Sequence, residues 1–393
     1  MISIQTQHFN INRILLLAIG LWPYQQSRLV QFQVIFIFGI LTSSIVFQLT
    51  AFLTTECTPE FVINVLSITC ISIIYLIKYN AFRINIHNTK YLLEELQQIC
   101  NELKDENEIA IIKNYGCSAR RYTIILILLA MCYVVAVNVQ PIWPRIFGFL
   151  LFLNDSRSRS AIQVTTEYFV DQEKYFYLIM LHMNASFCIG TLATVASAAM
   201  FLTYFKHACG IFKIASYRME QAINNDILQN VKDKVMICEK IIYAVDIHRK
   251  SLRFTKFVVT SFEGMFFCIL AVGVACLSLN LFRTFQLVSF GNDIEELLLH
   301  LSLVISILLY LYLMSYVAQE VTDHNKHVFE TVYNVQWYIA PVDIQRMILF
   351  LLQIGIKDLK LKLGGLIVAS LESASTITST SLSYFTVLYS TWQ

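Results

Sequence analysis

Hydroxyl side chains crowd the last apolar stretch of the chain. Between 370 and 391 there are twelve: Ser370, Ser373, Ser375, Thr376, Thr378, Ser379, Thr380, Ser381, Ser383, Thr386, Ser390 and Thr391. In hydrocarbon, such groups need hydrogen-bond partners on their own backbone, on neighbouring helices or in water. A helix that faced only lipid would not require them. We therefore expect this stretch to face protein, an aqueous pathway, or both.

The spacing of these residues gives the stretch one continuous face. Glu372, Thr376, Thr380, Ser383, Val387 and then Ser390 or Thr391 recur every three or four residues, which places them on one side of a helix. A polar face that crosses a membrane is what a pore-lining helix provides. Small hydroxyl residues also allow membrane helices to pack closely. The spacing alone leaves both interpretations open.

Composition indicates the class of protein to which this helix belongs. The 393 residues are 56% hydrophobic and 14% charged, whereas about 25% is typical of soluble domains. Apolar runs long enough to cross a bilayer fall at about 32–54, 61–82, 123–143, 176–205, 257–282, 297–318 and 366–389. We expect an all-α, polytopic membrane protein with seven transmembrane helices, organised as one domain over 1–393. The net charge of +2 gives no reason to expect a nucleic-acid partner.

Basic residues predict the orientation of these helices. Ten Lys and Arg residues lie between the fourth and fifth runs, against one between the fifth and sixth. Lys and Arg accumulate on the cytoplasmic side of membrane helices. We expect a cytoplasmic N-terminus and an extracellular C-terminus. The glycosylation sequon at Asn154 would then fall in an outer loop.

A second helix is predicted just before the hydroxyl-rich one. Ile344, Ile348 and Leu351 form a short apolar stripe over about 343–354, a segment too short to span a bilayer. A turn rich in Lys and Gly, 357–365, follows it. The seventh helix is therefore predicted to be split into a cytoplasmic half and a membrane half.

The outer halves of the other helices are candidates for a ligand site. They carry a mixture of thioether, apolar and hydroxyl side chains: Ser67, Cys70, Met131, Val135, Met180, Met183, Phe187, Ser302 and Ser306. This mixture suits small apolar ligands with one polar group. The same residue types are ordinary in the core of a membrane protein, and for any single residue the core role is the more common one.

Signatures of enzyme chemistry are missing from the sequence. There is no HExxH, Walker A, GxGxxG, CxxC or GxSxG pattern, so we expect neither an enzyme nor a cofactor. His324 and His327 have a spacing compatible with a metal, but on a polar helix they are usually solvated, and no metal is predicted. Glu263 and Glu372 are intramembrane charges by position. Each is also near the cytoplasmic end of its run, so functional and structural roles are both open.

The C-terminal quarter resembles the insect odorant receptors. The residues that carry the resemblance are Tyr333, Trp337, Tyr338, Pro341, Arg346 and Leu349, the 357–365 turn, Ser370-Leu371-Glu372, and the terminal Ser383-Tyr384-Phe385-Thr386-Val387-Leu388. Near the N-terminus, Gly20-Leu21-Trp22-Pro23 is also similar to receptors of this family.

This resemblance implies a tetrameric, ligand-gated, non-selective cation channel in the plasma membrane of sensory neurons. A variable subunit binds small volatile odorants and assembles with a shared coreceptor subunit. The pore is lined by the last helix, here by Thr380, Ser383, Val387, Ser390 and Thr391, and its constriction aligns with the last three. Thr391 is polar where the coreceptor is apolar, and the coreceptor's long insertion between helices four and five is missing. Both features indicate an odorant-tuning subunit.

Two alternatives remain at the level of sequence. One is a gustatory receptor of the same superfamily, although Ser383-Tyr384 is not followed by the Gln-Phe of that group's signature. The other is a membrane transporter that forms no channel. Ligand-evoked current with weak ion selectivity distinguishes a channel from a transporter.

Overall fold

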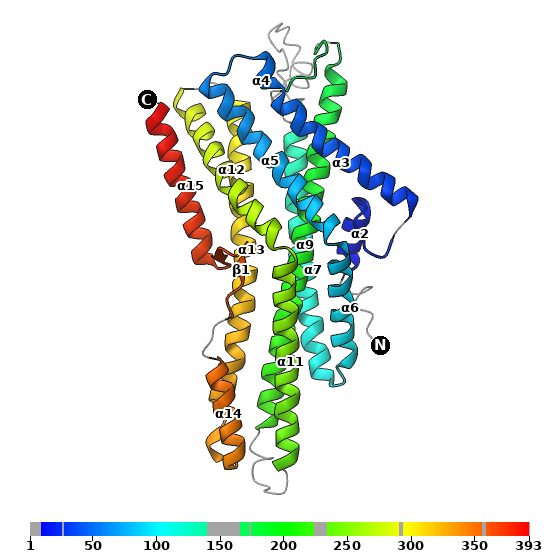
Figure 1. Cartoon of the computed structure of the whole chain (residues 1–393), viewed down its shortest axis with the longest axis vertical. Helices are drawn as coiled ribbons and strands as arrows, with labels where there is room; N and C mark the ends of the chain where they lie inside the picture. The colour runs from blue at the N-terminus through cyan, green and yellow to red at the C-terminus, as the bar shows by residue number, and fades with distance from the viewer. Residues whose placement is uncertain are drawn as a thin grey trace, which may run out of the picture.

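The computed structural model describes residues 9–25, 27–139, 166–172, 174–223, 234–290, 294–355 and 359–392. Within these ranges the regular secondary structure is helical apart from one short hairpin. The helices are α2 (Asn10–Ala18), α3 (Arg28–Leu49), α4 (Ala51–Thr54), α5 (Pro59–Ile84), α6 (Ile86–Glu102), α7 (Glu106–Val139), α9 (Phe176–Ala222), α11 (Lys234–Ser261), α12 (Glu263–Phe290), α13 (Ile294–Asn334), η2 (Trp337–Ile339), α14 (Val342–Gly355) and α15 (Leu371–Trp392). They form one elongated bundle (Figure 1).

Helix α9 is the axis of this bundle. It runs for 47 residues, and α5, α7, α11 and α13 pack around it. Small residues such as Ala193, Ala196 and Ala199 are buried on α9 and let neighbouring helices approach closely. At Gly190 the approach is tightest, because an added Cβ would lie 2.0 Å from the ring of Tyr75. The sequence predicts an end near 205, but α9 continues into the inner half of the molecule.

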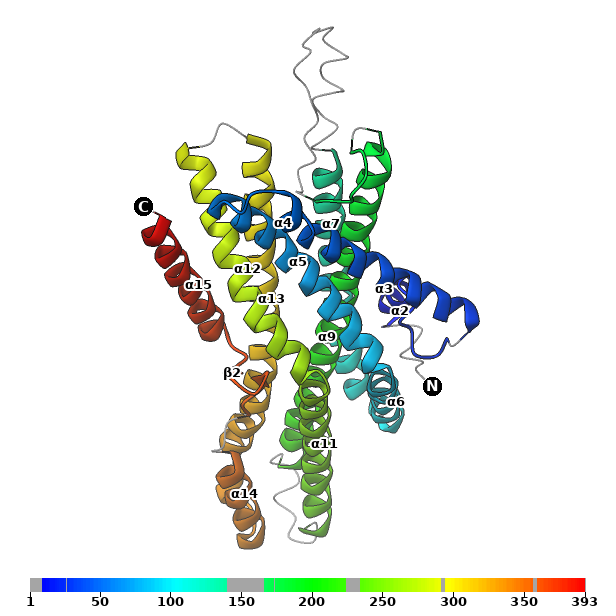
Figure 2. The ribbon, with the colours of Figure 1, turned by 45° about the horizontal axis from the view of Figure 1, so that its top comes forward.

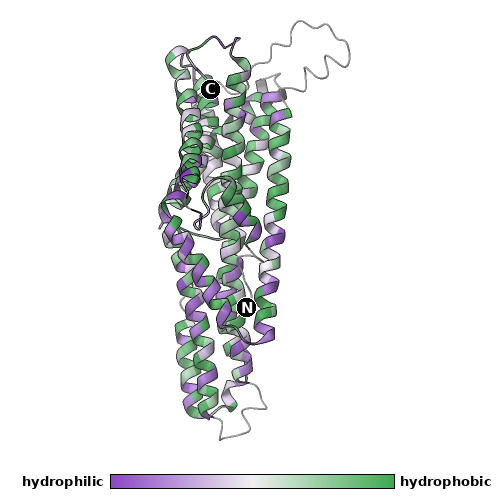
Figure 3. Ribbon diagram, turned by 90° about the vertical axis from the view of Figure 1, so that its right-hand side faces the viewer, coloured by the Kyte–Doolittle hydropathy of each residue, from purple (hydrophilic) through white to green (hydrophobic). Residues whose placement is uncertain are grey.

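The bundle has an apolar half and a half in which polar and apolar residues alternate (Figure 3). In the part of the chain that the structure describes, six helices are long and apolar enough to cross a membrane: α3 with α4, α5, α7, α9, α12 and α13. Helix α15 is not among them by hydropathy, since its many hydroxyl groups lower its apolar character. Beyond the apolar half, α7, α9 and α13 continue as amphipathic extensions.

The predicted run 257–282 is divided between two helices. Helix α11 ends at Ser261 and α12 begins at Glu263. Phe262, which separates them, is 1% exposed, and its ring lies 4.9 Å from the rings of both Phe82 and Phe201, measured between centroids. Aromatic packing around Phe262 therefore fixes the junction between α11 and α12.

The end of the bundle that carries α14 has its own apolar cluster. Ile237 and Ile241 of α11 and Ile344 and Ile348 of α14 are buried together beneath α9. This explains the stripe that the sequence shows at 344–351. It also explains why α14, which is too short to cross a membrane, is an ordered helix.

A hairpin separates α14 from α15. Strands β1 (Lys362–Leu363) and β2 (Ile367–Val368) pair antiparallel, with Lys362 opposite Val368. Gly364 and Gly365 have φ values of +57° and +71°, a conformation that favours glycine. The sequence predicts that the last helix begins at 366, whereas the hairpin occupies these residues and α15 begins at Leu371.

Candidate functional site

Three aromatic rings meet between the membrane helices. Phe187 of α9 contacts Tyr75 of α5, with 6.4 Å between ring centroids, and Tyr133 of α7 at 5.5 Å. We call these residues the three-ring cluster. The hydroxyl of Tyr75 lies 3.4 Å from Thr191 Oγ1. The hydroxyl oxygen of Tyr133 is buried, with Ser302 of α13 as a polar neighbour, and makes no close hydrogen bond among the described residues. The cluster thus combines an apolar surface with polar groups at its edge.

The predicted ligand residues fall into two groups around this cluster. Seven of them are buried or half-buried on α5, α9 and α13: Ser67, Cys70, Met180, Met183, Phe187, Ser302 and Ser306. Met131 and Val135 are each 59% exposed on the outside of α7. The structure therefore does not bring these two together with the rest. Ser302 and Ser306 donate hydrogen bonds to carbonyls of their own helix, at 2.7 Å each.

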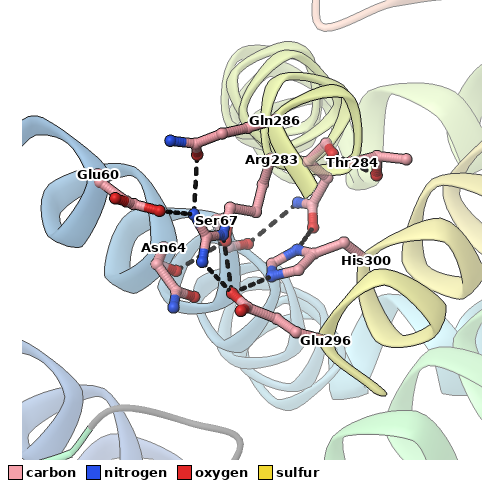
Figure 4. A network of polar contacts seen from close by, with 9 residues as sticks. Glu60, Asn64, Ser67, Arg283, Thr284, Gln286, Glu296 and His300 are labelled. Carbon is pink, nitrogen blue, oxygen red and sulfur yellow. Dashed lines mark hydrogen bonds and ion pairs between the residues drawn. The ribbon is translucent and has the colours of Figure 1, made fainter. Parts of the chain in front are cut away.

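A polar network joins α5, α12 and α13 near the first turns of α5 and α13 (Figure 4). Arg283 of α12 donates to Glu60 of α5 and Glu296 of α13, both at 2.7 Å. His300 Nδ1 of α13 lies 2.9 Å from Asn280 Oδ1, and the amide nitrogen of Asn280 donates to the carbonyl of Ser67 at 3.2 Å. Arg283, Asn280 and His300 are buried. Among the described residues, His300 Nε2 makes no close hydrogen bond but lies 3.7 Å from the Glu296 carboxylate. The contacts of Arg283 and Asn280 therefore clamp the three helices together.

The five predicted pore residues lie on one exposed face of α15. Thr380, Ser383, Val387, Ser390 and Thr391 are all exposed. The four hydroxyls donate to carbonyls of α15 itself, at 2.8 to 3.1 Å. We call this face the hydroxyl stripe. Its polar groups need no partner from another helix of the chain.

The opposite face of α15 holds the helix to the bundle. Ser381 is fully buried, and its carbonyl accepts a hydrogen bond from Ser278 of α12 at 3.0 Å. Phe385 packs against Phe282 and Phe285 of α12. Figures 1 and 2 both show α15 at the edge of the bundle, next to α12 and α13. The hydroxyl stripe therefore points away from the other helices of its own chain.

A family model confirms the assignment suggested by the C-terminal residues. The model described as the seven-transmembrane odorant receptor matches residues 58–382. The chain belongs to the odorant receptor family. Members of this family are ligand-gated channels of the membrane and are not enzymes, so the prediction that this chain is not an enzyme is confirmed.

Solved structures show that the receptor also has the fold of this family. The insect olfactory receptor OR5 from Machilis hrabei, in complex with eugenol, matches with a TM-score of 0.80 and 15% sequence identity, over 98% of this chain and 97% of that one. A second structure of OR5 matches with a TM-score of 0.76, 14% identity and 97% coverage of both chains. No curated protein matches the sequence. The predicted all-α, multi-pass membrane fold is confirmed.

The two histidines considered for a metal do not act together in the receptor. His324 lies 2.6 Å from the hydroxyl of Tyr115 and 2.8 Å from the carbonyl of Glu320, while His327 approaches Lys213. His324 instead groups with Glu320 and Cys209. Glu320 already forms an ion pair with the buried Lys206, at 2.6 Å. Because these groups are engaged, they offer a cation little free charge.

The two acidic residues singled out in the sequence have a common position in the receptor. Glu263 lies in the first turn of α12 and Glu372 in the first turn of α15, and both are exposed. A carboxylate at the N-terminus of a helix interacts favourably with the helix dipole. Asn154 lies outside the described residues.

Sequence reasoning missed one charged residue of the receptor. Lys78 lies inside the predicted run 61–82 and is 2% exposed. The rule that draws attention to Glu263 and Glu372, that charges inside a membrane run are costly, applies to Lys78 as well. Tyr75 and Tyr133 carried no such signal, because tyrosine is common in membrane helices.

Proposed function

We propose that this receptor is the odorant-tuning subunit of a cation channel that it forms with the coreceptor, in the plasma membrane of sensory neurons. In this proposal the N-terminus is cytoplasmic and the C-terminus extracellular. A small volatile ligand binds in the outer membrane half around the three-ring cluster. The hydroxyl stripe of α15 lines the pore.

One observation carries the pore proposal: the most polar face of α15 is also the face that its own chain leaves uncovered. Were the hydroxyls there for packing within the chain, residues such as Thr380 and Ser383 would lie against α12 or α13. Instead the packed face carries Ser381 and Phe385. Neighbouring subunits around a shared axis would place the stripe against water rather than lipid.

The ligand site is supported by the shape of the cluster and by a relative. Three rings from α5, α7 and α9 converge there, and ligand sites in proteins are mostly apolar with a few polar groups. The structure of OR5 was solved in complex with eugenol, a small volatile molecule. We propose that the present receptor binds a ligand of similar size.

Cysteine accessibility tests the pore proposal. Ser383→Cys and Val387→Cys are introduced in a Cys57→Ser background, since Cys57 is exposed and lies on the proposed outer side. The receptor is expressed with the coreceptor, and a small charged thiol reagent is added outside during odorant application. With a positively charged reagent we expect modification at both positions to reduce the current, because a fixed positive charge in the pore opposes the passage of cations.

The matched control is Ser381→Cys, which carries the same change on the packed face of the same helix. It is expected to be inert to the reagent, since Ser381 is fully buried. Normal surface expression with no modification at any position of the stripe would contradict the pore proposal. Robust odorant-evoked current from this chain without a coreceptor would contradict its assignment as a tuning subunit.

A further inference from the structure

A lysine is buried in the membrane half without an acidic partner. Lys78 of α5 is 2% exposed. Its ammonium nitrogen lies 3.6 Å from the centroid of the Tyr310 ring of α13, and no hydrogen bond or ion pair joins it to another residue in the part of the chain that the structure describes. The ring face supplies a cation–π interaction. That interaction is weaker than the water or carboxylate that a buried ammonium normally requires.

Lys206 is a buried lysine of the same protein whose charge is neutralised by a carboxylate. It is 4% exposed and also lies over a ring, that of Tyr122 at 4.7 Å. Its ammonium additionally contacts both carboxylate oxygens of Glu320, at 2.6 and 2.8 Å. The two lysines are thus equally buried and both lie over tyrosine. They differ in that one has a carboxylate and the other has none.

The position of Lys78 connects it to the candidate ligand site. Lys78 follows Tyr75 by three residues, so it lies on the same face of α5 and about 4.5 Å further inward. Tyr310 follows Ser306 by one turn, about 6 Å inward along α13. Lys78 and Tyr310 therefore lie next to the three-ring cluster on its inner side. The buried hydroxyl of Tyr133, which makes no close hydrogen bond among the described residues, is a second polar group in the same region.

We propose that Lys78 recognises an acceptor oxygen on the odorant, a carboxylate or a carbonyl, at the inner end of the ligand site. An ammonium in a low-dielectric interior is stabilised by an anion or a strong acceptor, and the described residues supply neither to Lys78. A ligand that carries such an oxygen gives Lys78 the kind of contact that Lys206 obtains from Glu320. This inference rests on the proposed ligand site around the three-ring cluster.

Binding of matched ligands to the purified full-length receptor tests the proposal. The probes are octanoic acid, octanal and 1-octene, which share a chain length and differ in the acceptor group. We expect the wild type to bind the acid, the aldehyde or both more tightly than the alkene. Lys78→Met should weaken binding of the acceptor ligands by about tenfold to hundredfold, the range of one charge-assisted hydrogen bond, and leave 1-octene unchanged. Lys78→Arg should retain the preference.

The pattern across the panel identifies the acceptor or overturns the proposal. A loss confined to octanoic acid assigns a carboxylate, and a loss confined to octanal assigns a carbonyl. Equal wild-type affinity for the three probes, no binding of either acceptor ligand, or the same loss for all three in Lys78→Met overturns it.

Stability measurements separate recognition from a structural role. Without ligand, Lys78→Met should unfold at the wild-type temperature or above it, because the variant removes an uncompensated charge. A clearly lower unfolding temperature would assign Lys78 a structural role and overturn the proposal. The matched control, Lys206→Met, should unfold at a lower temperature, since it leaves Glu320 without its ammonium, and should preserve the ligand ranking.

Recording current from the same variants with the coreceptor keeps the two proposals apart. Lys78-dependent binding without any evoked current would contradict the channel function and leave the recognition by Lys78 intact. Evoked current whose ligand ranking is the same in wild type and Lys78→Met would support the channel and overturn the recognition.

Discussion

Helix α11 and the amphipathic extensions of α7, α9 and α13, which together we call the inner bundle, satisfy their polar groups in the opposite way to helix α15. In the inner bundle, side chains pair across helices: Lys206 with Glu320, Arg218 with Glu108, and His248 with Asn325. In the hydroxyl stripe of α15, each hydroxyl donates to a carbonyl of its own helix. Cross-helix pairs tie elements together, whereas local pairs leave a helix face independent of its neighbours.

This difference indicates which part of the receptor holds the subunit together. Helix α9 is buried along most of its inner length and is surrounded by α7, α11 and α13. Helix α15 is attached through one face only, by residues such as Ser381 and Phe385. We therefore expect substitutions in the bundle to alter stability, and substitutions on the hydroxyl stripe to alter permeation.

The largest expected effect is the loss of an aromatic residue from the core. Phe201 is fully buried, and its ring packs against Phe82, Phe262 and Phe266. Phe201→Ala removes these contacts and leaves a cavity, which should lower the free energy of unfolding by about 3 to 5 kcal/mol. Thermal unfolding of the purified receptor measures this.

The control for this prediction is Leu382→Ala on α15. Leu382 is 47% exposed, so the same kind of truncation should change stability by less than about 0.5 kcal/mol in the isolated subunit. If Leu382→Ala were as destabilising as Phe201→Ala, the proposed division between bundle and stripe would be wrong.

A smaller effect is expected from a buried histidine of the inner bundle. His248 lies 2.9 Å from the side-chain oxygen of Asn325 and packs against Phe212 and Phe329. Burial lowers the pKa of His248, and the hydrogen bond to Asn325 only partly opposes this. The unfolded chain therefore binds a proton at a higher pH than the folded one. Stability should fall as the pH drops below about 6.5, the ordinary pKa of histidine.

His248→Gln removes this titration while keeping a polar side chain next to Asn325. Its unfolding temperature should therefore change less between pH 7 and pH 5.5 than that of the wild type. His87→Gln on α6, the same substitution at an exposed position, controls for the change of side chain itself. An unaltered pH dependence in His248→Gln would show that other groups determine the acid sensitivity.

The sequence predicts features that follow from the periodicity of a helix. It does not reveal how each helix is rotated about its own axis. The apolar runs and the spacing of the hydroxyl stripe follow from the repeat of a helix, and the short helix around Ile344 and Ile348 appeared with nearly the predicted bounds. Which side of a uniformly apolar helix faces the core is set by packing, which periodicity does not reveal. Met131 and Val135 were therefore selected as ligand residues, although they lie on the outside of α7.

Helix ends were obscured for a related reason. The sequence does not reveal that α9 continues past 205, because Lys206 and His207 resemble the start of a solvated loop. In the structure both residues are buried. Lys206 is buried because Glu320, more than a hundred residues away, supplies its counter-charge. Such a partner belongs to the tertiary structure and cannot be inferred from the local sequence.

Thr380 is the position where we expect the smallest effect on stability together with a clear effect on function. Thr380 is exposed and donates to the carbonyl of Thr376 at 2.8 Å. Thr380→Val preserves the shape of the side chain and removes a hydroxyl that contacts only its own helix. The free energy of unfolding should change by no more than about 0.5 kcal/mol. Conductance or ion selectivity should nevertheless change, because an apolar surface replaces a polar one along the proposed pore.

We expect the opposite outcome at the adjacent residue, Ser381. Ser381→Val inserts the same side chain at a fully buried position against α12, where overpacking should lower stability by about 1 to 3 kcal/mol. Single-channel recording and thermal unfolding on the two variants separate the faces of α15. Should Thr380→Val destabilise the subunit and leave conduction unchanged, the stripe would be a packing surface, and the pore would have to be lined by another part of the receptor.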